Sequence, residues 1–260
     1  MPTKHPLRDQ RRDRMAAKAL RQKEPGRAGV YSSESPSGKI QEALERTPGL
    51  SSKEHFFAPP SRLFNVPGGG HASTIFAALL RKRASDLSYE RELVPTDDGG
   101  QLCIDTVSSK GAALSRARTV FVLIPGLGGN SNDPYVTMFA SRAADRGAAV
   151  CAVNMRGCGH SPLRTPCFFS ARRGSVEDVR SVCEYIRGRT RDDCQLIGIG
   201  WSNGGTVLSH VLADACSGCE DGTTPAQHFD CAACLAVPFD LNACAKNLAR
   251  PFHRIVYDKR

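Results

Sequence analysis

The 260-residue sequence lacks three features that mark secreted and membrane-spanning proteins. It has no hydrophobic leader at its amino terminus, no apolar run long enough to cross a bilayer, and no Asn-x-Ser/Thr glycosylation site. Cysteine is abundant, but the count of 11 is odd. We therefore expect reduced thiols in a reducing compartment, and an intracellular protein that is either cytoplasmic or peripheral to a membrane.

The first 55 residues have few aromatic side chains and an excess of positive charge. They contain 12 Lys and Arg against 7 Asp and Glu, which is more than half of the net charge of +9. Such a segment cannot bury enough apolar surface to offset the entropy lost on ordering. We predict a disordered basic tail over residues 1–55 and a globular domain over residues 56–260. The tail could be solvated, could contact anionic lipid or nucleic acid, or could target an organelle, and we expect no specific nucleic-acid binding.

Apolar runs alternate with helical patterns from residue 119 onward. A continuous apolar run is typical of a strand buried on both faces of a parallel sheet. A hairpin around 97–100 precedes the first run, and Ser175 with Asp178 suggests a capping box at the start of one helix. The pattern predicts an α/β protein with a mostly parallel, doubly wound sheet. The expected strands are 89–94, 101–107, 119–124, 148–155, 196–200 and 231–237, and the expected helices follow the strands at 119–124, 148–155 and 196–200.

A glycine-rich stretch at the end of the strand at 196–200 contains the pattern Gly-x-Ser-x-Gly, at Gly200, Ser202 and Gly204. Between a strand and a helix, this pattern holds a serine on a sharp turn, and glycine on either side avoids collisions with neighbouring backbone. The sequence therefore predicts Ser202 as a catalytic nucleophile. An ordinary glycine-rich turn with a buried serine is the alternative.

A serine nucleophile also requires donors for the oxyanion that forms on the attacked carbonyl group. The sharp turn at Ser202, a nucleophile elbow, directs the N–H of Asn203 into such a site. A second N–H is expected from the loop after the strand at 119–124. We choose Leu127 there, because the glycines around it let the backbone turn its amides inward. The loop fits neither the dinucleotide pattern nor the P-loop pattern, so nucleotide binding is a weak alternative.

These motifs together resemble the YheT-type branch of the α/β-hydrolases, which includes abhydrolase-domain esterases, acylglycerol lipases and phospholipases. The similarity covers roughly residues 56–258. It implies ester hydrolysis through an acyl-serine intermediate on Ser202, with Leu127 and Asn203 as oxyanion donors, a small ester or lipid substrate and no cofactor. The motifs are Pro-Gly-Leu-Gly-Gly at 125–129, Arg-Gly-Cys-Gly-His-Ser-Pro at 156–162, Gly-Trp-Ser-Asn-Gly-Gly at 200–205 and Val-Pro-Phe-Asp at 237–240.

The sequence departs from this pattern after residue 240. In the hydrolase order of serine, acid and histidine, the last two residues follow later strands than the one at 231–237. We therefore expect the last strands and the closing helix to be missing, as in a carboxyl-terminally truncated domain. Asp240 is a candidate acid, and the candidate bases are His160, His210 and His253.

Two Cys-x-x-Cys pairs offer a rival interpretation. Cys216 and Cys219, with Cys231 and Cys234, could form a tetrahedral zinc site. However, the second pair lies in an expected strand, where side chains at i and i+3 point to opposite faces. We therefore expect small buried thiols and no metal.

Two hypotheses of different classes follow. The first is a serine hydrolase of the carboxylesterase or acylglycerol lipase class, with Ser202 as nucleophile and possible peripheral contact with a membrane. The second is a catalytically inactive binding or scaffold protein of the same fold that lacks the acid and the histidine.

Overall fold

The computed structural model describes residues 87–107, 114–216 and 228–256, with the side chains of residues 215, 216 and 256 excepted. All of them belong to one compact unit, Arg81–Arg260. The predicted tail over 1–55, the globular segment from residue 56 to 86, and Cys219 lie outside the described residues. Among the described residues, no helix is long and apolar enough to span a membrane.

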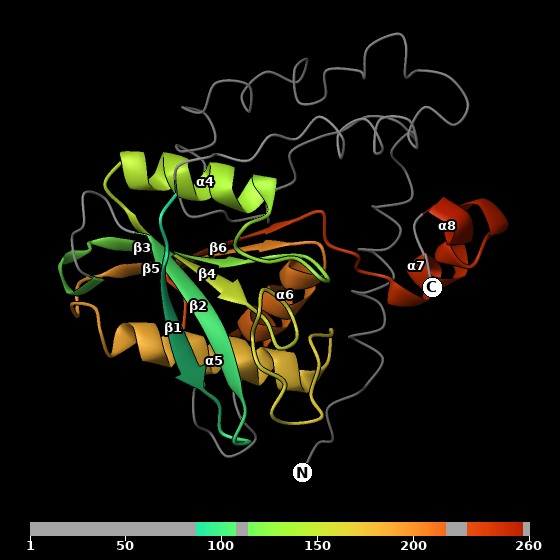
Figure 1. Ribbon diagram of the computed structural model, residues 1–260, viewed down its shortest axis with the longest axis horizontal. Coiled ribbons are helices and arrows are strands. Elements are labelled where there is room, and N and C mark those ends of the chain that lie inside the picture. The colour runs from blue at the N-terminus through green and yellow to red at the C-terminus, as the bar shows by residue number, and fades with distance from the viewer. Residues whose placement is uncertain (1–86, 108–113, 217–227, 257–260) are drawn as a thin grey trace, which may run out of the picture. The chain divides into compact units, whose positions relative to one another are not determined.

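A six-stranded mixed sheet forms the centre of this unit (Figure 1). The strand order is β1-β2-β4-β3-β5-β6, in which β4, β3, β5 and β6 are parallel and β1 and β2 are antiparallel to their neighbours. The α/β fold with a mostly parallel sheet is as the sequence predicts, and so is the hairpin. The strands are β1 (Glu90–Pro95), β2 (Gln101–Val107), β3 (Thr119–Ile124), β4 (Ala149–Asn154), β5 (Gln195–Trp201) and β6 (Cys231–Leu235).

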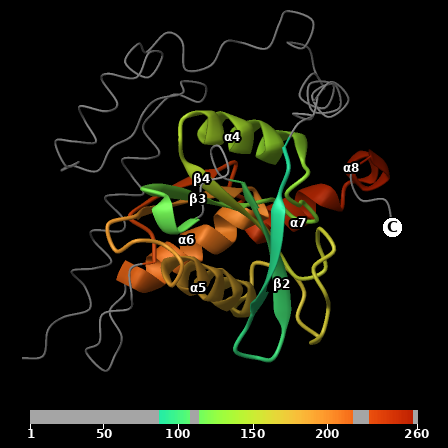
Figure 2. The same cartoon turned by 60° about the vertical axis from the view of Figure 1, so that its left-hand side comes forward.

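Helices cover both faces of the sheet. Helix α4 lies on one face, and α5 and α6 lie on the other, as the two views show (Figures 1 and 2). Each face has its own apolar core, one centred on Val136 and Ala140 of α4 and the other on Val179 and Leu208 of α5 and α6. The helices are η3 (Leu114–Arg116), α4 (Pro134–Asp145), α5 (Arg173–Arg187), α6 (Asn203–Cys216), α7 (Leu241–Leu248) and α8 (Pro251–Val256).

The capping box predicted for α5 is wrong. The helix begins at Arg173, two residues before Ser175, and its N-cap residue makes no side-chain hydrogen bond. Ser175 Oγ instead accepts from the N–H of Ser170, and the Asp178 carboxylate pairs with Arg156. A tertiary ion pair therefore takes the place of the local cap.

Candidate active site

Ser202 lies on the sharp turn between β5 and α6. Its backbone φ is 51°, a left-handed conformation that costs a residue other than glycine on the order of 1–3 kcal/mol. Hydrogen bonds hold the turn, because the Ser202 N–H donates to the Leu235 carbonyl at 2.9 Å and its carbonyl accepts from the Thr206 N–H at 3.0 Å. The Ser202 side chain is exposed. The fold thus presents this hydroxyl at the carboxyl end of β5, where reactive groups gather in such sheets.

The two glycines that flank Ser202 have no room for a side chain. A Cβ atom at Gly204 would overlap the carbonyl oxygens of Ile124 and Pro125, and one at Gly200 would lie 2.7 Å from the Gly204 carbonyl oxygen. The close approach of β3, β5 and α6 therefore requires glycine at both positions.

The loop from Pro125 to Asp133 lies beside the turn. An ideal Cβ built on Gly126 would be 3.8 Å from Ser202 Oγ, so this part of the loop adjoins the hydroxyl. Neither the N–H of Leu127 nor that of Asn203 donates a hydrogen bond to any described residue.

Tyr135 connects this loop with the turn. Its hydroxyl accepts a hydrogen bond from the Gly126 N–H at 3.1 Å, and its ring packs against Trp201 with 5.2 Å between centroids. Because Trp201 immediately precedes Ser202, the Tyr135 side chain contacts both the loop that contains Leu127 and the turn that contains Ser202. Sequence reasoning did not identify Tyr135, whose contribution depends on tertiary packing.

A buried arginine supports the second loop, residues 156–162. Arg156 is 4% exposed, and its Nε donates to both carboxylate oxygens of Asp178 at 3.0 Å. Its terminal nitrogens also bind Asp98 at 2.6 and 2.8 Å and the hydroxyl of Thr96 at 3.0 Å. Hydrogen bonds from Arg156 hold the pKa of Asp98 well below its usual range, whereas burial raises the pKa of Asp178. The arginine thereby joins the β1–β2 turn, the second loop and α5.

No candidate base forms a hydrogen bond with the serine among the described residues. Ser202 Oγ makes no hydrogen bond within the part of the chain that the structure describes. His160 is exposed with a φ of 68°, His210 is exposed on α6, and His253 lies on α8. Asp240, the candidate acid, is the N-cap of α7 and accepts from the Ala243 N–H at 2.8 Å.

Metal ligands are not gathered in the described residues either, where no group of three or more His, Cys, Asp or Glu side chains could hold an ion. Cys231 is exposed on β6, and Cys234 lies within 3.5 Å of the Ser209 hydroxyl. The other two members of the predicted four-cysteine site, Cys219 and the side chain of Cys216, lie outside the described residues.

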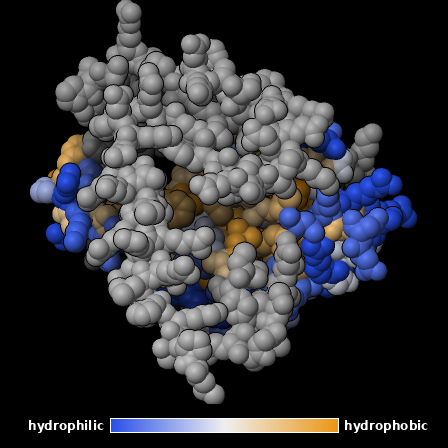
Figure 3. All heavy atoms as spheres, turned by 180° about the vertical axis from the view of Figure 1, so that it is seen from behind, coloured by the Kyte–Doolittle hydropathy of each residue, from blue (hydrophilic) through white to orange (hydrophobic). Residues whose placement is uncertain are grey.

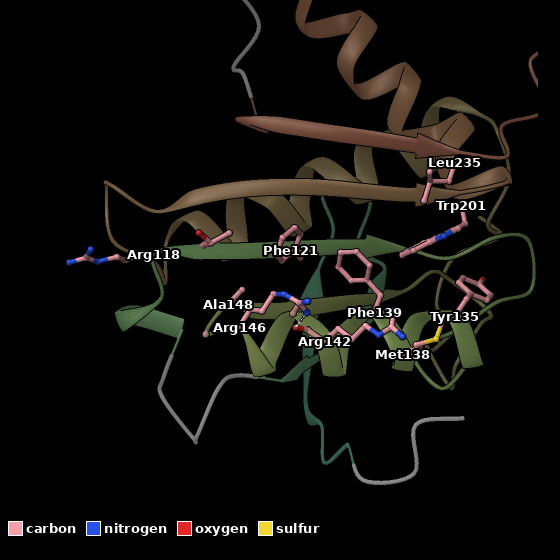
Figure 4. Close-up of a pocket in the computed structure, with 13 residues that line it drawn as sticks. Arg118, Phe121, Tyr135, Met138, Phe139, Arg142, Arg146, Ala148, Trp201 and Leu235 are labelled. Atoms are coloured by element: carbon pink, nitrogen blue, oxygen red, sulfur yellow. Dashed lines mark hydrogen bonds between the residues drawn. The ribbon is translucent and has the colours of Figure 1, made fainter. Parts of the chain in front are cut away.

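An apolar groove of about 820 Å³ lies between α4 and the sheet (Figure 4). Phe121, Phe139 and Trp201 form its aromatic floor, with ring centroids 5.2 Å apart for the first pair and 5.9 Å for the second. Ser202 does not line this groove, although Trp201 beside it does. Three arginines also line it, Arg118, Arg142 and Arg146.

Comparisons with known proteins agree with this geometry. Residues 119–254, more than half of the chain, match the family described as alpha/beta hydrolase fold. A solved structure of an esterase from Pyrococcus furiosus shares the fold with a TM-score of 0.51 at 13% identity, covering 68% of this chain and 67% of that one.

Three curated relatives have related sequences. Embryogenesis-associated protein EMB8 of Picea glauca is 31% identical over 65% of this chain and 38% of its own length. Phospholipase ABHD3 of Mus musculus is 26% identical over 66% and 40%, and the putative esterase YheT of Escherichia coli is 26% identical over 71% and 50%. The chain thus spans about two fifths to one half of the length of these relatives. It belongs to the α/β-hydrolase fold family, in the branch of the abhydrolase-domain proteins.

Proposed function

We propose that this protein is a serine hydrolase of the carboxylesterase or acylglycerol lipase class, with Ser202 as its nucleophile. One observation supports this most directly. The only serine with a positive φ among the described residues is also exposed at the end of a central strand. A strained, exposed serine between a strand and a helix is the arrangement that a hydrolase uses to present a nucleophile.

The chemistry would proceed through an acyl-serine intermediate. Ser202 Oγ attacks the ester carbonyl carbon while a base removes its proton, and the carbonyl oxygen becomes an oxyanion that accepts from the N–H groups of Leu127 and Asn203. Collapse of this intermediate breaks the bond to the alcohol, which leaves with the proton. Water then attacks the acyl-serine, and this step releases the carboxylic acid and restores the hydroxyl.

The described residues do not identify the base of this scheme. A histidine oriented by a carboxylate performs this role in serine hydrolases. Asp240 is bonded to the start of α7, and no histidine bonds to Ser202 in the described residues. Removal of the base and acid would leave only the smaller acceleration that an oxyanion hole and binding supply.

That no described histidine bonds to Ser202 favours a second candidate function, an inactive binding or scaffold protein that retains the acyl-binding face. Labelling with a fluorophosphonate probe separates the two, because the probe reacts with an activated serine. We expect labelling of the wild-type chain that disappears in Ser202→Ala. Ser209→Ala is the matched control, since Ser209 lies on α6 and bonds to the Gly205 carbonyl.

Labelling that survives in Ser202→Ala would assign the reactivity to another residue. A folded wild-type chain, judged by its thermal transition, that remains unlabelled but binds a fatty acid would support the binding protein instead.

The substrate is proposed to be a small ester or a lipid. The names of the relatives, putative esterase and phospholipase, support this class. Hydrolysis rates for p-nitrophenyl esters of increasing chain length, a monoacylglycerol and a phosphatidylcholine would distinguish an esterase from a lipase. Sedimentation with anionic vesicles would test the expected peripheral contact with membranes.

A further inference from the structure

A buried polar cluster lies beneath the loop that contains Leu127. Asp105 of β2, Asn154 at the end of β4 and Ser131 before α4 are 2%, 0% and 0% exposed. Asp105 is the only charged residue of β2, and it lies among the five buried residues of that strand. A buried carboxylate is costly unless it is fully paired, so the partners of Asp105 decide what the cluster can do.

Four donors satisfy the Asp105 carboxylate. Arg91 binds it in a bidentate manner with two contacts of 2.6 Å, Asn154 Nδ2 donates at 2.8 Å, and the Ser131 hydroxyl also donates to it. Burial raises the pKa of Asp105, but the hydrogen bonds from these residues outweigh that effect and leave the pKa below its usual value. The carboxylate is therefore charged and fixed in one orientation.

Every polar group of Ser131 is held by a different part of the sheet. Its N–H donates to Asn154 Oδ1 at 2.9 Å, its hydroxyl donates to Asp105 of β2, and its carbonyl accepts from the Tyr89 hydroxyl, just before β1, at 3.0 Å. Burial together with the Asp105 charge raises the pKa of Tyr89 to about 12, so this hydroxyl remains a donor. The backbone at Ser131 is thus fixed in position relative to the three strands.

Asn154 also contacts the second loop. A Cβ at Gly159 would overlap Asn154 Oδ1, and the Asn154 carbonyl accepts from the Ser161 hydroxyl. The same asparagine therefore sets the position of both loops at this edge of the sheet.

Ser131 follows Leu127 by only four residues. The Gly129 N–H bonds to the carbonyl of Gly126, on the other side of Leu127, at 2.9 Å, and Gly126 is held in turn by Tyr135. The loop is anchored on both sides of Leu127, and a displacement of about 1 Å in such a position can cost on the order of 100-fold in rate.

We infer that Asp105, Asn154 and Ser131 are positioning residues that fix the loop of Leu127 in the geometry needed to stabilise an oxyanion beside Ser202. The part of this inference that concerns the oxyanion rests on the proposed function. The part that concerns the geometry of the loop does not.

Ser131→Ala is the sharpest test, because it removes one hydroxyl and leaves the ion pair of Asp105 with Arg91. Thr106→Val is the matched control. Thr106 is the next residue of β2, is 7% exposed, and contacts Cys151 Sγ at 3.2 Å, away from the loop. Hydrogen–deuterium exchange of the whole chain measures the loop amides without requiring catalysis. We expect the hydrogen-bonded amides of Gly126, Gly129, Asn130 and Ser131 to exchange at least about tenfold faster in Ser131→Ala, and at the wild-type rate in Thr106→Val.

The rate of fluorophosphonate labelling of Ser202 gives the functional readout. We expect it to fall roughly 10- to 100-fold in Ser131→Ala, below the loss of about 100- to 1,000-fold that removal of a whole oxyanion donor causes. For a hydrolysed ester, kcat should fall while KM changes by less than about twofold.

Unchanged exchange in Ser131→Ala would overturn the inference. Faster exchange with unchanged labelling would overturn its link to the oxyanion. A wild-type chain that is never labelled would refute the proposed function, and the exchange comparison would still decide whether the cluster positions the loop.

Discussion

The sheet is closely packed around β4 and open around β6. All six residues of β4 are buried, and α5 buries seven of its residues. By contrast, β6 and α7 bury none, and Phe239 and Ile255 are 85% and 73% exposed. Apolar surface is also visible on the side of the molecule turned away in Figure 1 (Figure 3).

This difference separates the parts of the proposed catalytic site. The strained serine and the two proposed oxyanion donors lie next to the packed side, where each loop is anchored by buried hydrogen bonds. In the chain order of hydrolases, the acid and histidine come after the strand that follows the elbow. In this chain that region begins at β6, where the described residues form little core. The proposed nucleophile and oxyanion donors therefore belong to the packed part of the sheet, whereas the proposed acid, Asp240, lies beyond β6.

The largest loss of stability is expected for Arg156→Met, in the closely packed part of the sheet. It would leave Asp178, which is 1% exposed, without its partner, and an uncompensated buried charge costs about 3–5 kcal/mol. Urea unfolding followed by circular dichroism measures the loss. Arg191→Met is the control, because Arg191 and Asp193 pair at the surface with 51% and 62% exposure, and we expect no measurable change there. Equal midpoints for both variants would contradict the assigned role of Arg156.

A pair of leucine truncations tests the contrast in apolar packing. Leu196 of β5 is fully buried, so Leu196→Ala should reduce the free energy of unfolding by about 2–5 kcal/mol. Leu248 of α7 is 45% exposed, and Leu248→Ala should change it by less than about 0.5 kcal/mol. The measurement is again urea unfolding of each full-length variant. A comparable loss for Leu248→Ala would show that α7 is packed in solution.

The sequence predicted those parts of the fold that depend on local patterns. The run at 119–124 is continuously apolar because β3 lies between β4 and β5 and is covered on both faces. The glycines at 200 and 204 were recognisable because backbone crowding at the elbow leaves no room for other residues. Such features require only neighbours along the chain or a general property of parallel sheets.

The sequence did not predict the polar clusters, because their members are far apart in the chain. Arg156 and Asp178 are 22 residues apart, and Asp105 and Asn154 are 49 apart. Asp178 was assigned to a helix cap for the same reason, since its distant partner was invisible. The available signal was Asp105 itself, the only charged residue of an expected strand, which indicates a buried partner.

The pH dependence of stability tests the packing at the start of β6, where the closely packed part of the sheet meets the open part. His228 precedes β6, and burial, together with the nearby charge of Arg180, lowers its pKa below the usual 6.5. The unfolded chain therefore binds a proton more readily than the folded one, and stability falls as the pH drops below about 6.5. Urea unfolding between pH 8 and pH 5 should show a smaller loss for His228→Gln than for the wild type. If the free energy of unfolding depended on pH equally in His228→Gln and the wild type, His228 would be solvated in the folded protein.

The smallest expected effect is an increase in the free energy of unfolding, from a substitution at the end of α5. Gly188 has a φ of −65°, and a Cβ there would lie 3.6 Å from the Glu184 carbonyl oxygen, an ordinary contact. Alanine fits this conformation and reduces the entropy of the unfolded chain, so Gly188→Ala should stabilise the protein by about 0.4–1 kcal/mol. Gly204→Ala is the opposite case, because its Cβ would overlap the backbone of β3, and we expect it to destabilise the protein. Thermal unfolding of both variants checks the pair. If Gly204→Ala were tolerated as well as Gly188→Ala, the close approach of α6 to β3 that presents Ser202 would be absent in solution.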